Sequence, residues 1–431
     1  MRSEEIHEKL MNYVNQSPCS FFAVANLKRE LREAGFRELK ETEAWRLVPG
    51  DRCYVSRNSS SLISFILPEG PLNSFHVIAA HSDSPSFKLK PGPLLRSECG
   101  LLRASVEKYG GPIDSTWFDR PLSVSGRVFV KDGDQITERL VFPEDLTLML
   151  PSVAPHLLRK EQGSEQVTAA GHMFPVVGSG KDEALLRDRI AAELRISPDR
   201  ILSADLYLCN REQALLWGAE REFLSAPRLD DLACAYASFL GFRQADTAEH
   251  FADIHCVFDN EEIGSRTRQG ADSGFLRDVL ERICEGLGLS ASEYHRAVAA
   301  GFLVSADNAH AVHPNYEELS DPVNRPQLNG GLVLKHQAGQ RYATDAETAA
   351  VFRLICQRSR LPVQDFTNRP GSPGGSTLGN LSISHIPLRT ADIGLPQLAM
   401  HSCFETIGAR DVPQLTAFAA SFYGADLPAV V

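Results

Sequence analysis

Two adjacent glutamates near the end of an apolar segment are the residues of this chain best suited to do chemistry. Residues 254–258 are typical of a buried strand, and Glu261 and Glu262 follow shortly after. Ionised carboxylates are rarely buried unless they are paired or bound to a metal. By itself such a pair is more often a solvated surface turn. In a hydrolase, however, one Glu can ligate a metal while its neighbour takes a proton from a metal-bound water.

Other residues of metal-binding types fall at or just after the predicted elements of the same part of the chain. In open α/β sheets, ligands collect at the carboxyl ends of strands, so positions far apart in sequence can converge there. Each residue alone has a simpler interpretation, because Asp often caps a helix and a lone His is often structural. Together with the glutamate pair they favour a metal site. The candidate ligands are His81, Asp230, Glu262, Asp307 and His401.

This residue set suits two zinc ions. Zinc accepts imidazole nitrogen and carboxylate oxygen, and two ions ~3.5–4 Å apart can stabilise a hydrolytic transition state. If Asp230 bridges the ions, each ion receives three protein ligands and a position for water remains. Manganese or cobalt are possible substitutes, because availability selects among such metals as much as affinity does. We assign His81, Asp230 and Asp307 to one ion, and Asp230, Glu262 and His401 to the other.

Two further acidic residues near these positions receive different roles. Glu261 is free to act as general base on the bridging water and then as acid toward the leaving amine. Asp83 follows His81 by two residues, so it is placed to orient that imidazole.

Length and composition indicate a soluble two-domain protein. A chain of 431 residues exceeds the usual size of one hydrophobic core. Its content of 43% apolar residues is typical of a globular protein and argues against a disordered one. The net charge of -11 argues against non-specific nucleic-acid binding. The first residues lack an apolar leader, and no segment has the ~20 apolar residues of a membrane span. We therefore expect a cytoplasmic protein with no nucleic-acid or membrane partner, and the nine scattered cysteines as reduced thiols.

Strand and helix patterns alternate in two separated parts of the chain, which predicts a mixed α/β fold with helices on both faces of a central sheet. Residues 1–90 and 223–431 form the predicted catalytic domain, and residues 91–222 a smaller, mostly β insertion. We expect the insertion to serve oligomerisation and substrate access. Strands are predicted at 62–67, 75–80, 254–258, 302–305 and 388–393, and helices near 231–244, 271–286, 345–359 and 412–423.

Several stretches from near residue 80 to near 402 carry a resemblance to a known family. They are residues 80–85, 109–111, 115–120, 228–230, 259–265, 304–307, 309–316, 340–343, 375–377 and 396–402. In these stretches the chain resembles the aspartyl aminopeptidase family of zinc metallopeptidases. The resemblance implies a zinc exopeptidase that removes single N-terminal residues from peptides, with a preference for Asp or Glu, and a catalytic domain interrupted by a smaller one.

The resemblance also implies an assembly and further site residues. It implies a tetrahedral homo-oligomer of twelve subunits, in which His156 reaches a neighbouring active site and polarises the scissile carbonyl. It implies that Lys335 pairs with the acidic side chain of the substrate's first residue. A surface His and a solvated Lys are the alternatives for these two residues. The peptide bond between Asp230 and Asp231 is expected to be cis.

Two other functions fit the same residues. A deacylase or carboxypeptidase could use the same metals on an N-acyl or C-terminal substrate. An assembly or cargo protein that no longer catalyses is the alternative of another class, and it would have no need of two bound metal ions per chain.

Overall fold

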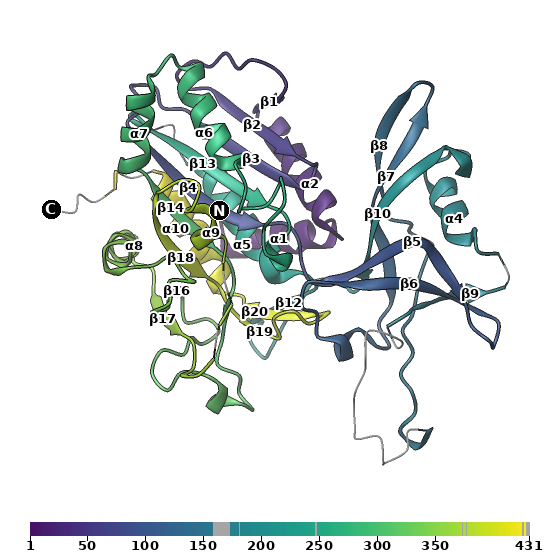
Figure 1. Ribbon diagram of the computed structural model, residues 1–431. Coiled ribbons are helices and arrows are strands. Elements are labelled where there is room, and N and C mark those ends of the chain that lie inside the picture. Colours follow the sequence, from purple (N-terminus) through teal and green to yellow (C-terminus); the bar gives the residue numbers. More distant parts are fainter. Residues whose placement is uncertain are drawn as a thin grey trace.

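The computed structural model describes residues 1–157, 173–180, 182–245, 248–372, 374–375, 377–424 and 426–427. The strands in these ranges form sheets of nine, six and five strands. Figure 1 shows a larger part, in which helices surround the nine-stranded sheet, and a smaller part built on the six-stranded sheet. The five-stranded sheet lies between them, below the large sheet in that view.

Three neighbouring parallel strands form the centre of the large sheet. They are β13 (Phe251–Phe258), β4 (Ser74–His81) and β14 (Phe302–Ala306), and almost every residue in them is buried. Continuous apolar runs of this kind are typical of strands covered on both faces. The full order is β1 (Arg37–Leu39), β2 (Arg52–Arg57), β3 (Ser61–Ile66), β13, β4, β14, β18 (Arg389–Gly394), β16 (Leu332–His336) and β17 (Val363–Thr367).

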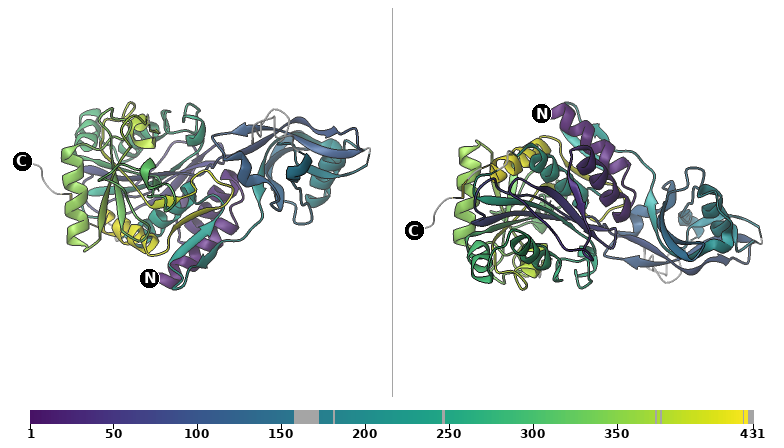
Figure 2. Two further views of the ribbon diagram at one scale, coloured as in Figure 1. Left: turned by 90° about the horizontal axis from the view of Figure 1, so that it is seen from below. Right: turned by 90° about the horizontal axis from the view of Figure 1, so that it is seen from above.

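Helices cover both faces of this sheet, as Figure 2 shows, which confirms the predicted fold class. Side chains alternate along β4, so Ile78 and Ala80 enter one core while Val77 and Ala79 enter the other. One core is closed by α1 (Ser3–Asn15), α2 (Ser20–Glu33), α5 (Leu229–Gln244), α8 (Ala346–Arg358) and α10 (Asp411–Tyr423). The other is closed by α6 (Phe275–Gly286), α7 (Ala291–Ala300) and α9 (Leu378–Ser382).

The smaller part has its own core between the six-stranded sheet and α4 (Leu185–Glu193). Its strands are all antiparallel and run in the order β8 (Gln135–Val141), β7 (Leu122–Asp132), β10 (Ile201–Asn210), β5 (Ser86–Arg96), β6 (Leu101–Tyr109) and β9 (Val176–Ser179). The division of the chain at residues 90 and 222 stays a prediction. Residue 91 lies inside β5.

The five-stranded sheet was not predicted, because its strands are too short to carry a clear alternation of apolar and polar residues. Its order is β11 (Leu215–Trp217), β12 (Phe223–Ala226), β20 (Glu405–Gly408), β19 (Pro396–Leu398) and β15 (Ala309–His310). It matters for function because β12 leads into Asp230, and because the turn between β19 and β20 contains His401.

The four predicted helices agree closely with the structure, except at the start of one of them. The helix predicted from about residue 271 begins at Phe275, because the chain bends through residues 270–274. Helix α7 was not predicted, although Ser290 and Glu293 form a capping box at its start. The peptide bond between Asp230 and Asp231 is cis, as the resemblance implies.

Two further observations concern the cysteines and the helices. All nine cysteines are free thiols, and Cys99 alone is exposed. In the described ranges, no helix has the length and apolar character needed to cross a membrane.

One buried acid in the central sheet lies away from the candidate ligands. Asp253 in β13 is fully buried, and neither of its carboxylate oxygens receives a hydrogen bond from the described residues. Burial raises the pKa of Asp253 to about 9. In an unfolded chain the pKa of Asp is ~3.9, so between these values the folded state holds one more proton than the unfolded state.

This excess proton predicts a pH-dependent stability. The contribution of protonated Asp253 is fully present below the unfolded pKa and is lost as pH rises through the folded pKa, so the free energy of unfolding falls by about 1.4 kcal/mol per pH unit between them. The variant Asp253→Asn should remove this slope. Denaturant unfolding of both proteins at pH 5.5, 6.5 and 7.5 measures it, with Asp134→Asn in an exposed turn as the control. Equal slopes in the wild type and Asp253→Asn would contradict the prediction.

Candidate metal centre

The central strands bring three of the candidate ligands to one edge of the large sheet. His81 is the last residue of β4, and Asp307 directly follows β14. Glu262 lies in the short helical turn η4 (Glu261–Ile263), just after β13. Because the three strands are parallel neighbours, their carboxyl ends meet at the same edge.

The other two candidate ligands come from the five-stranded sheet. Asp230 lies at the start of α5, after β12, and His401 lies in the turn between β19 and β20. The φ angle of His401 is 67°, and that of Arg228, just before Asp230, is 61°. Residues other than glycine rarely adopt this left-handed region, so the surrounding structure must hold both turns.

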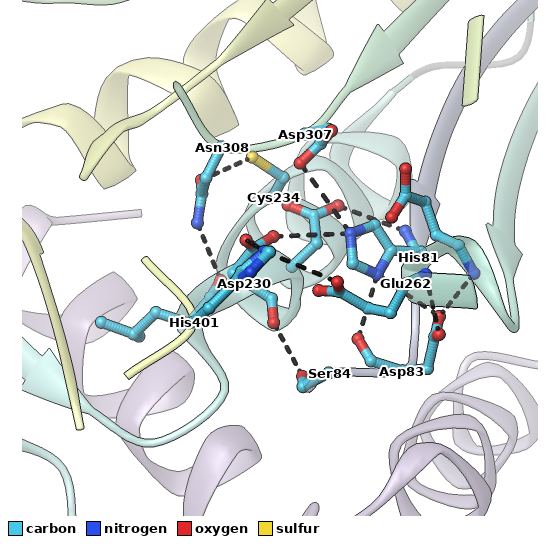
Figure 3. A network of polar contacts seen from close by, with 12 residues as sticks. His81, Asp83, Ser84, Asp230, Cys234, Glu262, Asp307, Asn308 and His401 are labelled. Carbon is cyan, nitrogen blue, oxygen red and sulfur yellow. Dashed lines mark hydrogen bonds and ion pairs between the residues drawn. The ribbon is translucent and has the colours of Figure 1, made fainter. Parts of the chain in front are cut away.

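The five side chains converge on one small space, as most of them can be seen to do in Figure 3. The two oxygens of Asp230 face different imidazoles. Nε2 of His81 lies 3.4 Å from Asp230 Oδ1 and 3.8 Å from Asp307 Oδ1. Nε2 of His401 lies 3.7 Å from Asp230 Oδ2 and 3.5 Å from Glu262 Oε2. The residues thus form two groups that share Asp230, and in each group the candidate ligand atoms lie within 4.8 Å of one another.

Both imidazoles are oriented in the same way. Nδ1 of His81 lies 3.0 Å from the main-chain oxygen of Asp83, and Nδ1 of His401 lies 3.1 Å from the main-chain oxygen of Gly111. A carbonyl oxygen only accepts hydrogen bonds, so in each ring Nδ1 is the donor. In the neutral form of each ring, Nε2 then carries a lone pair toward the carboxylates, as a metal-ligating imidazole requires.

The charges of the site fit a bound cation. Burial, and then the nearby charge of Asp230, raise the pKa of Glu262 well above its usual range. Burial likewise raises the pKa of Glu261 to about 8. Oδ1 of Asp230 is buried and receives no hydrogen bond from the described residues. Buried carboxylates of this kind need a positive partner, and imidazole nitrogen with carboxylate oxygen is a donor set that zinc accepts.

One side of the site contains a protein cation. Lys335 in β16 is buried, and its Nζ lies 3.5 Å from Asp307 Oδ2 and 5.7 Å from the centre of the Tyr342 ring. Burial by itself would raise the pKa of Asp307, but the ammonium group of Lys335 lowers it to about 2. Asp307 is therefore a stable anion next to His81.

Asp83 holds the turn that contains the two glutamates. Its Oδ1 accepts a hydrogen bond from the main-chain N–H of Glu261 (3.1 Å), and its Oδ2 accepts one from the N–H of Glu262 (3.2 Å). Tyr109 donates its hydroxyl to the same Oδ2 at 2.7 Å. The carboxylate of Asp83 also lies 3.4 Å from Nδ1 of His81, farther than its main-chain oxygen. It therefore contacts the turn of the glutamates as well as the imidazole.

Three residues that support the site were not identified from the sequence. Asp231 accepts a hydrogen bond from the main-chain N–H of His81 at 3.2 Å, and Asn308 donates to the main-chain oxygen of Leu229 at 2.9 Å. Glu405 accepts hydrogen bonds in both turns that contain Asp230 and His401. Its acidic side chain, the one charged residue in segment 403–409, was a signal that could have indicated it.

His156 lies apart from these residues. It belongs to the short turn η2 (Pro155–Leu157) and is exposed. Within the described part of the chain, no hydrogen bond or ion pair joins it to the five candidate ligands.

The site combines two imidazoles with several carboxylates at the carboxyl edge of a parallel sheet, and a further glutamate lies beside them. This arrangement is typical of a metal-dependent hydrolase. Comparison with known proteins leads to the same class of enzyme. The model of the family described as aminopeptidase I zinc metalloprotease (M18) matches residues 13–423. A probable M18 family aminopeptidase 2 of Clostridium novyi is 39% identical over 416 residues, which cover 94% of this chain and 95% of that protein.

Solved structures are similar over nearly the whole chain. Chaetomium thermophilum mApe1 is 30% identical with a TM-score of 0.89, and the match covers 98% of both chains. The S. cerevisiae mApe1 dodecamer is 27% identical with a TM-score of 0.87, and covers 97% of this chain and 96% of that one. The chain therefore belongs to the M18 family of zinc metallopeptidases, and its enzyme class is that of a zinc-dependent aminopeptidase. The resemblance seen in the sequence is confirmed.

The uncompensated charge of the site predicts an effect of metal removal. A chelator should abolish peptidase activity and lower the Tm, because the buried carboxylates then repel one another without a cation. A ligand at 100 times its Kd stabilises a protein by about 2.7 kcal/mol, so the shift should be several degrees. Thermal unfolding with and without chelator, followed by addition of zinc, measures it. In Asp307→Asn, zinc should raise the Tm by less than in the wild type. A wild-type Tm that does not change when chelator is added would contradict the prediction.

Proposed function

We propose that this chain releases N-terminal residues from peptides, with Glu261 as the general base. The observation that carries the proposal is the shared position of Asp230, whose two oxygens face His81 and His401. Two ions per chain would be held by His81, Asp230 and Asp307 on one side, and by Asp230, Glu262 and His401 on the other. Zinc is the proposed metal, with manganese or cobalt as substitutes.

Bound zinc would supply a Lewis acid that polarises the scissile carbonyl and makes water more acidic. The residues of the chain do the remaining work. Glu261 takes the proton from the attacking water and passes it to the nitrogen of the leaving amine. Its main chain is held by Asp83, and an oxygen of its carboxylate lies within 4.8 Å of a ring nitrogen of His81 and of a carboxylate oxygen of Glu262. Such a fixed position is what proton transfer in the site requires.

The proposal predicts different effects for the two members of the glutamate pair and for a matched pair elsewhere. Glu261→Gln should keep near-normal zinc content while kcat falls about 10²–10⁴-fold, the range typical of general acid–base catalysis. Glu262→Gln should lose zinc. Glu318→Gln is the control, because Glu317 and Glu318 also begin a short helical turn but are exposed. Metal analysis and kcat on one peptide measure all three variants, and full activity in Glu261→Gln would exclude its proposed role.

The proposed preference for Asp or Glu as the first residue rests on Lys335. This buried ammonium group lies 3.5 Å from Asp307 Oδ2, next to the proposed site of the reaction. A compact cation there would attract an acidic side chain on the residue whose carbonyl is attacked. Asp307 already compensates part of the positive charge of Lys335. The preference for an acidic first residue therefore depends on how much of that charge is left to attract the substrate side chain.

A panel of N-terminal aminoacyl substrates tests this preference. Substrates that begin with Asp or Glu should have the highest kcat/KM, and the ratio to Leu should fall as salt screens the charge. The panel is run with zinc, manganese and cobalt, and with each N-terminus free or acetylated. Equal rates on Leu and Asp substrates would contradict the role of Lys335. Activity on acetylated peptides would instead favour the deacylase alternative, and a chain that binds no metal and cleaves neither set would favour the cargo alternative.

The proposal includes a tetrahedral dodecamer, supported by the likeness to the S. cerevisiae mApe1 dodecamer. In that assembly His156 would reach the active site of a neighbouring subunit and polarise the scissile carbonyl. Its exposure within one chain is compatible with such a contact. The segment 91–222 would take part in assembly and substrate access. A cytoplasmic location is also part of the proposal, supported by the free state of all nine cysteines.

A further inference from the structure

Glu405 joins the two turns that contain Asp230 and His401. Its Oε2 accepts a hydrogen bond from the main-chain N–H of Asp230 at 3.0 Å. Its Oε1 accepts one from the main-chain N–H of His401 at 2.7 Å. Glu405 is 1% exposed, so water does not compete strongly for these hydrogen bonds. One carboxylate thus links two segments that are separated by more than 150 positions in the sequence.

The five-stranded sheet explains why Glu405 reaches both turns. Glu405 is the first residue of β20 and pairs with Ala226, the last residue of β12. The chain leaves β12 at this point and continues to Asp230. On the other side β20 pairs with β19, and the turn that joins these two strands contains His401. Glu405 therefore stands where the two turns leave the same small sheet.

The two N–H groups have no place in a regular helix or strand. Asp230 has φ and ψ angles of -84° and 105°, which are not helical although α5 is assigned from Leu229. His401 and Ala399 have positive φ angles of 67° and 55°. A buried N–H that loses its acceptor costs about 1–3 kcal/mol, so the acceptor decides whether such turns keep their shape.

We propose that Glu405 is a positioning residue that sets the affinity for the ion held by Asp230, Glu262 and His401. This inference rests on the proposed two-metal function. By accepting both N–H groups, the carboxylate holds the two main chains at a fixed separation, so the side chains of Asp230 and His401 are arranged before the ion arrives. Residues that support ligands in this way typically change metal affinity by about 10–100-fold when they are replaced.

The ion of this group should therefore depend on Glu405 more than the ion of the other group does. Asp307 follows β14 and His81 ends β4, so both are fixed by the pairing of the large sheet. Glu262 is held by Asp83 through its main-chain N–H. His401, in contrast, has its main-chain N–H bound by Glu405 and one ring nitrogen by Gly111. Only Asp230 is shared by both groups.

The test is a zinc titration of the intact protein against a competing chelator. The wild type should bind two ions per chain. In Glu405→Gln one carboxylate oxygen becomes an NH₂ donor, so one of the two N–H groups loses its acceptor. One binding step should weaken about 10–100-fold while the other changes little. Glu405→Asp keeps both acceptor oxygens on a shorter side chain and should weaken the same step less.

Two further measurements identify the weakened step as the one proposed. His401→Ala should lack that ion, and in the double variant Glu405→Gln, His401→Ala the remaining ion should bind as in His401→Ala alone. In Glu405→Gln, excess zinc should restore most of kcat, whereas it should not do so in Glu261→Gln. A spectroscopic titration with cobalt provides a second readout of the same step, independent of activity.

Asp411 offers a matched control. It is fully buried and accepts two main-chain N–H groups at the start of α10, from Asn329 at 2.7 Å and Gly331 at 2.9 Å, and among the described residues no hydrogen bond or ion pair joins it to the candidate ligands. Asp411→Asn should lower the Tm without changing either zinc affinity.

Three outcomes would overturn the inference about Glu405. These are unchanged binding of both ions in Glu405→Gln, equal weakening of both ions, or a loss of zinc affinity in Asp411→Asn as large as in Glu405→Gln. Equal weakening would mean that Glu405 acts through the shared Asp230 or through general stability and does not favour one ion, and a loss as large in Asp411→Asn would mean that it acts on general stability. If Glu405→Gln does not fold, the same comparison is made with Glu405→Asp. If the wild type itself binds fewer than two ions per chain, the proposed two-metal function fails, whatever Glu405 does.

Discussion

Buried negative charge at the carboxyl edge of the large sheet is the constraint on which the rest of this structure depends. The candidate ligands include three carboxylates, and Glu261, Asp83, Asp231 and Glu405 lie close by. Lys335 compensates part of this charge on the side of Asp307. Buried carboxylates repel one another strongly unless cations lie between them. A site of this composition therefore requires bound cations.

The surrounding carboxylates act mainly on the main chain. Asp83 accepts the N–H groups of the glutamate turn, Asp231 that of His81, and Glu405 those of Asp230 and His401. Each of these hydrogen bonds fixes the backbone of a candidate ligand or of Glu261 and leaves the side chain free. Main-chain anchoring of this kind lets the candidate ligands approach one another closely although their charges oppose it.

The sequence predicted much of the catalytic part of the molecule. Long apolar runs such as 254–258 and 302–305 predicted the central strands, and the periodic segments at 231–244 and 412–423 predicted their helices, because burial on two faces leaves a strong pattern. The short strands β12, β19 and β20 leave none. For this reason the sequence indicated Asp230 and His401 as candidates but not the small sheet that positions them, and it did not indicate Glu405.

The sequence by itself determined which chemistry is available: two imidazoles, several carboxylates and a glutamate pair, in stretches that resemble one family. It could do so because residue types and local patterns depend only on each residue and its neighbours in the sequence. Only the tertiary structure decided which of these groups meet. Strand pairing in the large sheet brings His81, Asp307 and Glu262 to one edge, and the small sheet brings Asp230 and His401 against them. Distances between residues so far apart in the chain follow from pairing and packing, which no local pattern records.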